Sequence, residues 1–402
     1  MVKPTEPLSN LSGTQDPSIR PAVSRRSIIK AIASVAGCGA LITTVPLVLS
    51  SKLRKRLDLD FLLRTGGLRH MLRDAPSENA GWYRPVSYPV LGGTLGTCFD
   101  ACVLRAGTGY RMWFSWRPRK SIAFAESADG IHWSTPVIML EPRDTGWEDE
   151  VNRPVVIQRN GQYQMWYTGQ TKEHSYIGFA TSPDGITWTR PSTRAVLAAN
   201  QPWEGSGVCC PHVLFDDSAN LYKMWYSAGE HFEPNAIGYA TSSDGVNWNK
   251  YGSGPVFQHE KRGTFDQARV TACCVVQDGD WYVMFYAGFA NEADSAIGLA
   301  RSHNGIDDWQ HHPSNPILAP TPRWNAWDRD AIYKPTVVRE ESRWMLWYNG
   351  RRDAVEQIGL AEHSGTDLGF PAYTISSPTS TSHVGVSQRP MICKSAEDIL
   401  RT

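Results

Sequence analysis

Charged and aromatic side chains recur together at five places along the chain, and these residue types suit the binding of sugars. Four of the places pair an aromatic residue with an acid, at residues 147–148, 203–204, 265–266 and 327–328, and the fifth contains Phe99-Asp100. Aromatic rings stack on the apolar face of a sugar, while carboxylates and guanidinium groups bond its hydroxyls. Two carboxylates across one pocket would also permit cleavage of a glycosidic bond.

We assign roles to the side chains around these places. The catalytic candidates are Asp100 as general base or nucleophile, Glu150 or Glu204 as acid, and Asp330, which with Asp149 would orient groups or tune a pKa. The residues expected to bind substrate are Asp149, Arg153, Trp147, Trp203, His212, Arg269, Trp327 and Lys334. Two alternatives stay open: the acids of the four aromatic pairs, Glu148, Glu204, Asp266 and Asp328, could cap strands as a repeat feature, and His212 could be a core histidine. No spacing specifies a metal, and no cofactor is expected.

A repeated segment indicates which elements position these residues. The motif Ser-x-Asp-Gly-x-x-Trp occurs at residues 127–133, 182–188 and 242–248, with looser copies at 302–309 and 363–370. Its five glycines, at positions 130, 185, 245, 305 and 365, are 55, 60, 60 and 60 residues apart. Such a period is typical of repeat architectures. A motif present five times is expected to be structural, because a catalytic residue is not needed in every copy.

Three strand-like motifs accompany each copy of the turn. An aromatic motif of the type Tyr-x-Met-Trp-Tyr begins at Tyr110, Tyr163, Tyr222, Tyr282 and Trp344. A motif of the type Ile-Gly-x-Ala begins at Ile122, Ile177, Ile237, Ile297 and Ile358, and a short apolar segment before each unit begins at Pro89, Pro136, Ala195, Pro255 and Pro316. With the inner strand, each unit has about four strands in 55 to 60 residues. The sequence therefore predicts an all-β protein, a five-bladed β-propeller with four-stranded blades over residues 82–373. All 16 Trp fall within this region, as expected if the repeats supply the aromatic core between blades.

Composition and charge argue against one class of function, nucleic-acid binding. The chain has 402 residues, 41% of them hydrophobic, with 40 Lys and Arg against 40 Asp and Glu. Residues 1–56 hold nine basic and two acidic residues, so the remaining 31 basic and 38 acidic residues make the body weakly acidic. An acidic body argues against a nucleic-acid partner. The vicinal pairs Cys209-Cys210 and Cys273-Cys274 are expected to be small buried strand residues.

The N-terminal region predicts export. Residues 24–30, Ser-Arg-Arg-Ser-Ile-Ile-Lys, followed by the apolar run 31–51, resemble a twin-arginine signal. The alternatives are an uncleaved membrane anchor and, more remotely, a lipoprotein box ending at Cys38. We expect a disordered N-terminus plus signal or anchor over 1–56, a linker with a short helix over 57–81, and a tail over 374–402. The expected partners are the twin-arginine export machinery and a carbohydrate, with membrane contact only through the signal or anchor. The expected location is the periplasm, the extracellular space or the outer side of the cytoplasmic membrane.

The five units, their strand motifs and Asn315-Pro316-Ile317-Leu318 resemble the five-bladed propeller glycosidases of glycoside hydrolase families 43, 32, 68 and 130. The resemblance covers residues 85–370 and implies a carbohydrate substrate and glycoside hydrolysis. In family 43 an Asp begins blade one, a second Asp lies on blade two and a Glu on blade three donates the proton. Asp100 matches the first, whereas Arg153 and Cys210 stand before the prolines of blades two and three. The competing hypotheses are a glycan-binding propeller without catalysis, a protein-interaction propeller and, more distantly, a sialidase.

Overall fold

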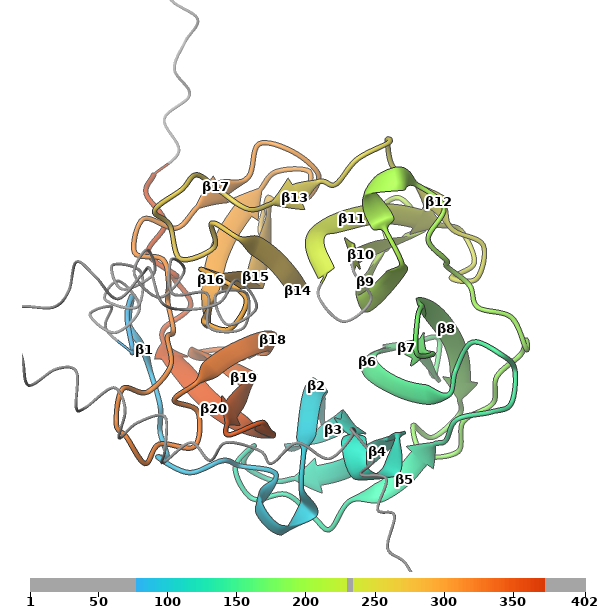
Figure 1. Cartoon of the computed structure of the whole chain (residues 1–402), viewed down its shortest axis with the longest axis horizontal. Helices are drawn as coiled ribbons and strands as arrows, with labels where there is room; N and C mark the ends of the chain where they lie inside the picture. Colours follow the sequence, from blue (N-terminus) through green and yellow to red (C-terminus); the bar gives the residue numbers. More distant parts are fainter. Residues whose placement is uncertain (1–76, 230–233, 373–402) are drawn as a thin grey trace, which may run out of the picture. The chain divides into compact units, whose positions relative to one another are not determined.

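The computed structural model describes residues 77–229 and 234–372, and nearly all of these residues belong to an antiparallel β-propeller. Five groups of strands lie around a central axis (Figure 1). The predicted leader, the linker up to residue 76 and the tail from residue 374 lie outside the described residues. Among the residues that are described, no helix is long and apolar enough to span a bilayer.

Each group, numbered here as repeat one to repeat five in chain order, begins with an inner strand beside the axis and continues outward. The inner strands are β2 (Cys98–Ala106), β6 (Glu150–Arg159), β9 (Gly207–Asp216), β14 (Arg269–Asp278) and β18 (Ala331–Arg339). The second strands are β3 (Gly109–Trp116), β7 (Gln162–Gln170), β10 (Leu221–Gly229), β15 (Trp281–Phe289) and β19 (Arg343–Arg352). Each inner strand contacts the inner strand of the next repeat, and β18 contacts β2. The ring of inner strands is therefore closed.

The outer part of each repeat is a long third strand with short pieces beyond it. The third strands are β4 (Ser121–Ser127), β8 (Ser175–Ser182), β11 (Pro234–Ser242), β16 (Ser295–Ser302) and β20 (Val355–Ser364). The short outer strands are β5 (Val137–Leu140), β12 (Asn249–Lys250), β13 (Phe257–Gln258), β17 (Gln310–His311) and β1 (Trp82–Tyr83). A single parallel bridge, Ser175 to Gly207, joins repeats two and three into one eight-stranded sheet, and the other sheets have four strands. The 3-10 helices are η2 (Gly93–Leu95), η3 (Arg117–Arg119) and η4 (Pro202–Glu204).

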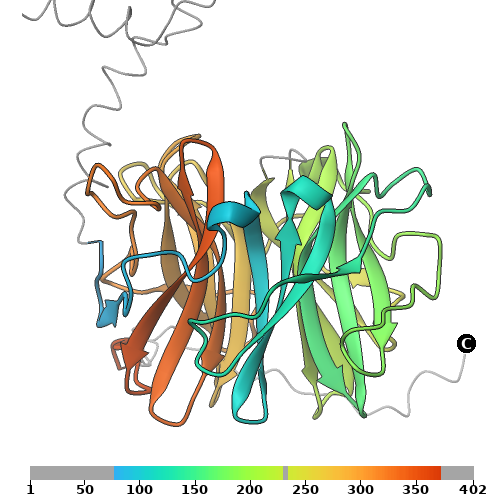
Figure 2. The same ribbon diagram turned by 90° about the horizontal axis from the view of Figure 1, so that it is seen from below.

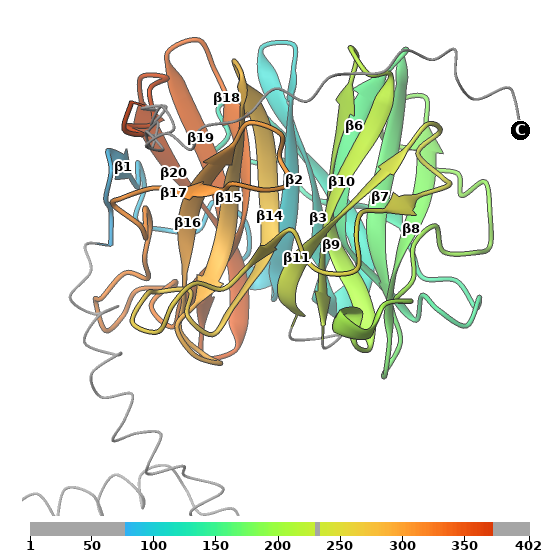
Figure 3. The same cartoon turned by 90° about the horizontal axis from the view of Figure 1, so that it is seen from above.

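The segment that begins at Trp82 closes the ring. Trp82 pairs with His363 on β20, and Leu91 bridges to Ile358 on the same strand. Figures 2 and 3 show this blue segment beside the red strands of repeat five. In repeat one, Trp133 bridges to Ser127 in the corresponding way. The N-terminal segment therefore supplies the outer strand and the tryptophan that the fifth copy of the turn motif lacks.

The repeated turn is structural, as predicted. In its first copy the Asp129 carboxylate accepts the backbone N–H groups of Ile131 and His132 at 2.9 and 2.8 Å, and Gly130 adopts a φ of 80°. The Gly130 carbonyl then accepts the indole N–H of Trp347 from repeat five at 3.0 Å. The same bond joins the buried indoles of three other repeats to the next turn, in the pairs Trp113–Gly185, Trp166–Gly245 and Trp225–Gly305. The turns thus join neighbouring repeats through the predicted aromatic core.

The six described cysteines are all buried and unbonded, which confirms the prediction for the two vicinal pairs. They occupy three inner strands, as Cys98 and Cys102, Cys209 and Cys210, and Cys273 and Cys274. Burial raises the pKa of Cys98 to about 12 and that of Cys102 to about 11, so both remain thiols at neutral pH.

Candidate active site

Five residues with positive φ mark equivalent positions on the five inner strands. They are Asp100 (52°), Arg153 (53°), Cys210 (48°), Ala272 (51°) and Lys334 (51°), called here the ring residues. A shift of pairing register accompanies them in β2, β6, β14 and β18. Residues other than glycine rarely adopt this conformation, and such strain concentrates at functional sites. The fold therefore brings one acid, two cations and two small side chains to equivalent places around the axis.

Hydrogen bonds between repeats hold four of these strained positions. The backbone N–H of Asp100 donates to the Asn349 side chain of repeat five at 2.7 Å. The corresponding pairs in the next three repeats are Arg153 to Ser115 at 2.7 Å, Cys210 to Thr168 at 3.1 Å and Ala272 to Ser227 at 2.8 Å. Each acceptor lies on the second strand of the preceding repeat. The backbone at these positions is therefore fixed by its neighbour.

Asp100 is the acid of the ring. Only 3% of its surface is exposed, and its carboxylate accepts a hydrogen bond from the Asn349 amide and lies 3.2 Å from Arg153 Nε. Burial raises the pKa of Asp100, while the charges of Arg153 and Lys334 and the bond from Asn349 oppose that rise. A carboxylate in these surroundings suits a general base whose pKa lies above that of a free aspartate.

Arg153 and Lys334 supply positive charge to the ring, from the strands on either side of Asp100. The Arg153 guanidinium forms an ion pair with Asp100 through Nε and donates a hydrogen bond to the Asn152 side chain through Nη1 at 2.8 Å. Lys334 is 4% exposed and acts electrostatically on Asp100, Cys210 and His212. Sequence reasoning assigned both cations to substrate binding, and the fold brings them to equivalent positions beside Asp100.

Cys210 occupies the ring position that the family resemblance would give to a proton donor. Its neighbours are the Cys209 thiol and the Ala272 side chain, with which it forms a buried cluster. Burial raises the pKa of the Cys210 thiol, but the hydrogen bond from Cys209 and the charges of Arg153 and Lys334 outweigh it, so the pKa is lowered. The same hydrogen bond and burial raise the pKa of Cys209. The ring therefore carries a polarised thiol in place of a carboxyl group.

Glu204, predicted as a possible general acid, lies inside repeat three. It is fully buried, and its carboxylate accepts the Tyr226 hydroxyl at 2.8 Å and lies 2.6 Å from Lys250 Nζ. The backbone N–H groups of Asn200 and Gln201 also donate to it, at 2.7 and 2.9 Å. Burial raises its pKa, but Lys250 and these donors more than compensate, so the pKa is lowered. A buried carboxylate with these partners cannot reach a sugar, and we therefore remove Glu204 from the predicted catalytic set.

A similar group of acid, tyrosine and basic residue occurs in three other repeats, which supports the strand-cap alternative. The groups are Glu148–Tyr167–Arg190, Asp266–Tyr286–His311 and Asp328–Tyr348–Arg84, joined by hydrogen bonds of 2.8 to 3.1 Å from each tyrosine to its acid. Repeat one has Phe114 at the tyrosine position, and the segment Gly93–Leu95 that precedes its inner strand contains no acid. Acid and tyrosine hydroxyl are thus present together or absent together, as expected for a structural unit.

The aromatic residues before these acids are structural as well. Trp147, Trp203 and Trp327 stack on the tyrosines of their own repeats, with ring centroids 6.1, 6.1 and 5.8 Å apart. The glycine of each Ile-Gly-x-Ala motif makes room for them: a Cβ on Gly238 would lie 2.8 Å from the Trp203 ring. The sequence predicts that these three indoles stack on sugar. In the structure each indole stacks on a tyrosine of its own repeat, which supports a structural role for that face.

The remaining predicted acids lie at strand ends. Glu150 begins β6, three residues before Arg153; its side chain is 34% exposed and lies 3.4 Å from Lys120 Nζ. Asp149 is exposed. Asp330 precedes β18, bonds Arg329 Nε at 3.2 Å and accepts the backbone N–H of Asp353 at 2.8 Å. Only Glu150 remains both accessible and on an inner strand.

His212 and Arg269, also predicted to bind substrate, serve the inner strands. The imidazole of His212 is 2.7 Å from the carbonyl oxygen of Val275 on the next inner strand, and burial lowers its pKa to about 3. Arg269 is 8% exposed, donates to the Glu292 carbonyl at 3.0 Å and lies over the Phe289 ring. The alternative of a core histidine fits His212 better than a sugar contact does.

Sequence reasoning missed the residues that support the ring. Asn349 bonds both the backbone and the carboxylate of Asp100. Glu356 accepts the Tyr333 hydroxyl and lies 3.0 Å from Arg117, and its charge acts on Asp100 and Arg153. The sequence does contain a signal for Asn349: when the second strands are aligned on their aromatic motifs, Asn349 is at the same position as Ser115, Thr168 and Ser227. Glu356 belongs to no motif repeated along the chain, so its sequence position gave no sign of its role.

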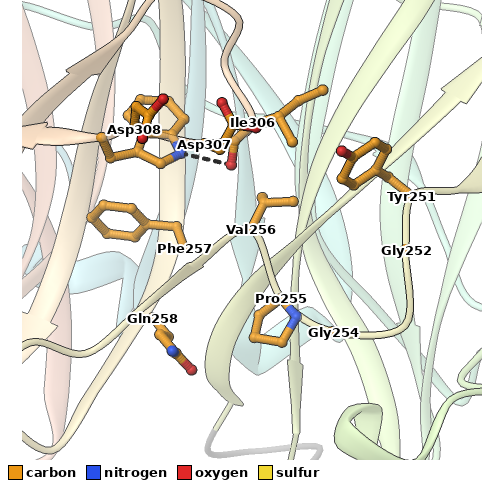
Figure 4. A pocket seen from close by; sticks show the side chains of 11 residues that line it. Tyr251, Gly252, Gly254, Pro255, Val256, Phe257, Gln258, Ile306, Asp307 and Asp308 are labelled. Atoms are coloured by element: carbon orange, nitrogen blue, oxygen red, sulfur yellow. Dashed lines mark hydrogen bonds between the residues drawn. The ribbon is translucent and has the colours of Figure 1, made fainter. Parts of the chain in front are cut away.

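A separate pocket lies on the outer side of repeats three and four (Figure 4). Tyr251, Phe257 and Trp309 contribute aromatic rings to it, and Asp307 and Asp308 contribute carboxylates. None of its lining residues belongs to an inner strand or was predicted as a site residue. Across residues 77–229 and 234–372, no three His, Cys, Asp or Glu side chains gather as metal ligands.

Comparison with known proteins assigns this chain to the class of propeller glycoside hydrolases. The model of glycosyl hydrolases family 43 matches residues 89–367, and the chain belongs to that family. This confirms the predicted resemblance and makes the protein a carbohydrate-active enzyme of the glycoside hydrolase type.

Related sequences and structures agree with this assignment. An uncharacterized protein of Mycobacterium tuberculosis is 28% identical over 225 residues, which are 50% of this chain and 72% of that protein. An acid beta-fructofuranosidase of Phaseolus vulgaris is 27% identical over 162 residues, 36% of this chain and 23% of the enzyme. Among solved structures, a glycoside hydrolase superposes with a TM-score of 0.57 at 20% identity, covering 73% of this chain and 95% of the other. A thermostable family-43 glycoside hydrolase superposes with a TM-score of 0.54 at 17% identity, covering 68% and 91%. These structures share the fold.

Proposed function

We propose that this protein is an exported five-bladed propeller enzyme that hydrolyses a glycosidic bond in an oligo- or polysaccharide, with Asp100 as its general base. The observation that carries the proposal is the placement of Asp100. It is the only acid among the five ring residues, and it matches the first catalytic Asp that the family resemblance implies. Its backbone is strained and its carboxylate is held by Asn349 and Arg153. A fixed carboxylate can take the proton of a water molecule that attacks the anomeric carbon.

The surroundings of Asp100 favour this role. Burial disfavours its charged form, which raises the proton affinity of the carboxylate, while Arg153 and Lys334 keep the ionised form accessible. Asn349 also holds the carboxylate in one orientation. The substitution Asp100→Asn would therefore remove the base, while the side chain keeps nearly the same shape.

Hydrolysis also needs a proton for the leaving oxygen, and we assign that task to Glu150. It is the only other predicted catalytic acid that begins an inner strand, and its carboxyl group is partly exposed. Glu204 is enclosed by Tyr226 and Lys250. Glu356 has one carboxylate oxygen on Tyr333 and the other beside Arg117. Glu150 is therefore the acid with the fewest competing partners.

Two ring positions favour a second candidate function, the binding of a glycan without cleavage. Arg153 stands where the family resemblance implies a second Asp, and Cys210 stands where it implies a proton donor. Without a carboxyl group that reaches the leaving oxygen, the same ring would bind sugar and release it unchanged.

Export is the remaining part of the proposal, and it rests on the sequence of residues 24–51. The twin-arginine pattern followed by an apolar run supports transport of the folded propeller across the cytoplasmic membrane. Fusion of residues 1–56 to a reporter that works only outside the cytoplasm tests this. Loss of the reporter signal on Arg25→Lys with Arg26→Lys is expected, and an unchanged signal would contradict twin-arginine transport.

Turnover separates the two functions. The full chain is assayed on nitrophenyl glycosides and on plant and bacterial polysaccharides, beside Asp100→Asn and Glu150→Gln. We expect Asp100→Asn to abolish turnover while the thermal unfolding transition persists, and Glu150→Gln to lower turnover by about 100-fold or more on substrates with a poor leaving group. Saturable sugar binding that survives both substitutions, with no turnover on any substrate, would leave the glycan-binding function.

A further inference from the structure

We propose that the ring of inner strands selects an acidic sugar, whose carboxylate is bound between Lys334 and Arg153. The inference rests on the proposed function, because it names the substrate class of the same site. It does not depend on which residue donates the proton.

Lys334 is the first observation. The residue is 4% exposed, on the inner strand of repeat five. Within residues 77–229 and 234–372, its ammonium group has no carboxylate within 4.0 Å and makes no hydrogen bond. Three other cations with largely buried side chains have such partners: Lys250 bonds Glu204, Arg190 lies beside Glu148, and Arg84 beside Asp328. A buried charge without a partner is costly, and proteins keep one where a ligand supplies the counter-charge.

Arg153 is the second observation. Its Nε forms an ion pair with Asp100 and its Nη1 donates to Asn152, whereas its Nη2 makes no hydrogen bond with any residue of the described part of the chain. One guanidinium edge therefore has donors left for an anion. An arginine amino group and an ammonium group on the two strands that flank Asp100 can each bond one oxygen of a carboxylate.

The charge balance of the ring points the same way. Asp100 carries one negative charge, and Arg153 and Lys334 carry one positive charge each. The nearby Glu356 does not restore neutrality, because it is matched by Arg117 at 3.0 Å. The two cations of the ring therefore outnumber its one carboxylate, and an anionic ligand would supply the further negative charge.

The other two ring residues have small side chains, which leave room around the axis. They are Cys210 and Ala272, and they pack against Cys209. Because the family binds carbohydrate, we assign the anion to the ligand itself, as a hexuronic acid. Free inorganic phosphate offers similar chemistry and is tested separately.

Binding measurements on the purified full chain test the proposal. Isothermal titration calorimetry compares galacturonate and glucuronate with galactose and glucose, which share the ring but lack the carboxylate, and with inorganic phosphate. We expect at least one uronate to bind about tenfold more tightly than its neutral counterpart. Lys334→Met should weaken uronate binding by about 10- to 100-fold, because it removes a buried charge partner, and should weaken neutral-sugar binding by a smaller factor. Lys334→Arg should retain most of the preference.

The control is Arg105→Met, which removes one positive charge from an exposed residue near the far end of β2 and should leave uronate binding unchanged. Equal binding of uronates and neutral sugars would overturn the proposal, as would binding of phosphate without any uronate. If Lys334→Met does not fold, a Lys334→Arg chain that loses the preference for uronates overturns it too. Uronate binding without turnover would contradict the proposed hydrolysis and support the acidic-sugar site. Turnover confined to neutral glycosides would support hydrolysis and contradict the acidic-sugar site.

Discussion

Replacement of Glu204 by glutamine tests whether the acids before the inner strands are structural. Glu204 is fully buried, and its carboxylate lies 2.8 Å from the Tyr226 hydroxyl and 2.6 Å from Lys250 Nζ. Gln has the same shape but no charge, so Glu204→Gln leaves the Lys250 ammonium buried beside a neutral amide. Breaking a buried ion pair by changing one partner costs about 3–5 kcal/mol. We expect the free energy of unfolding to fall by about that amount.

Urea unfolding followed by tryptophan fluorescence measures this change. The slope of free energy against urea should stay the same, because the surface exposed on unfolding is unchanged. The double variant Glu204→Gln with Lys250→Met should recover part of the loss, since the unpaired ammonium is gone. Turnover per folded molecule should remain near the wild-type value. A loss below about 1 kcal/mol, combined with the disappearance of turnover in folded protein, would refute the structural role and return Glu204 to catalysis.

Two further predictions concern pH and ring closure. Because the pKa of His212 is lowered to about 3 from an ordinary 6.5, the unfolded chain binds the proton more readily between these values. Stability should therefore fall as pH drops from about 6.5 towards 3, by up to about 1.4 kcal/mol per pH unit from this residue, and His212→Gln should reduce that slope in urea unfolding at several pH values; an identical slope would contradict it. Arg84→Met removes the cation beside Asp328 and Tyr348 and should cost about 3–5 kcal/mol of unfolding free energy, against about 1 kcal/mol or less for the exposed Arg105→Met; equal losses would contradict closure by the N-terminal segment.

The repeat made much of the fold predictable from sequence. The spacing of the turn glycines and the alternating aromatic motifs gave the strand order and the structural role of Asp129 and its equivalents. What the linear order did not indicate is that the segment from Trp82 to Leu91 belongs with repeat five. That pairing joins residues far apart in the sequence, and the missing tryptophan in the fifth turn was its only local sign.

The site was harder to predict because the same residue types serve the repeat and the ligand. Glu204 and Trp203 have the composition of a sugar site, but their partners Tyr226 and Lys250 come from later strands of the same repeat. Asp100 was found because it departs from that pattern. When the five repeats are compared, residues that vary together, such as the acid and its tyrosine, stabilise the fold. Residues that vary independently are better candidates for function.

The most direct test of the proposed function is turnover by the full chain beside the Asp100→Asn variant, on glycosides that include uronic acid substrates. We expect that the wild-type protein releases product, that Asp100→Asn does not, and that both unfold at similar temperatures. Turnover by Asp100→Asn at the wild-type rate would contradict the assignment of Asp100 as the general base.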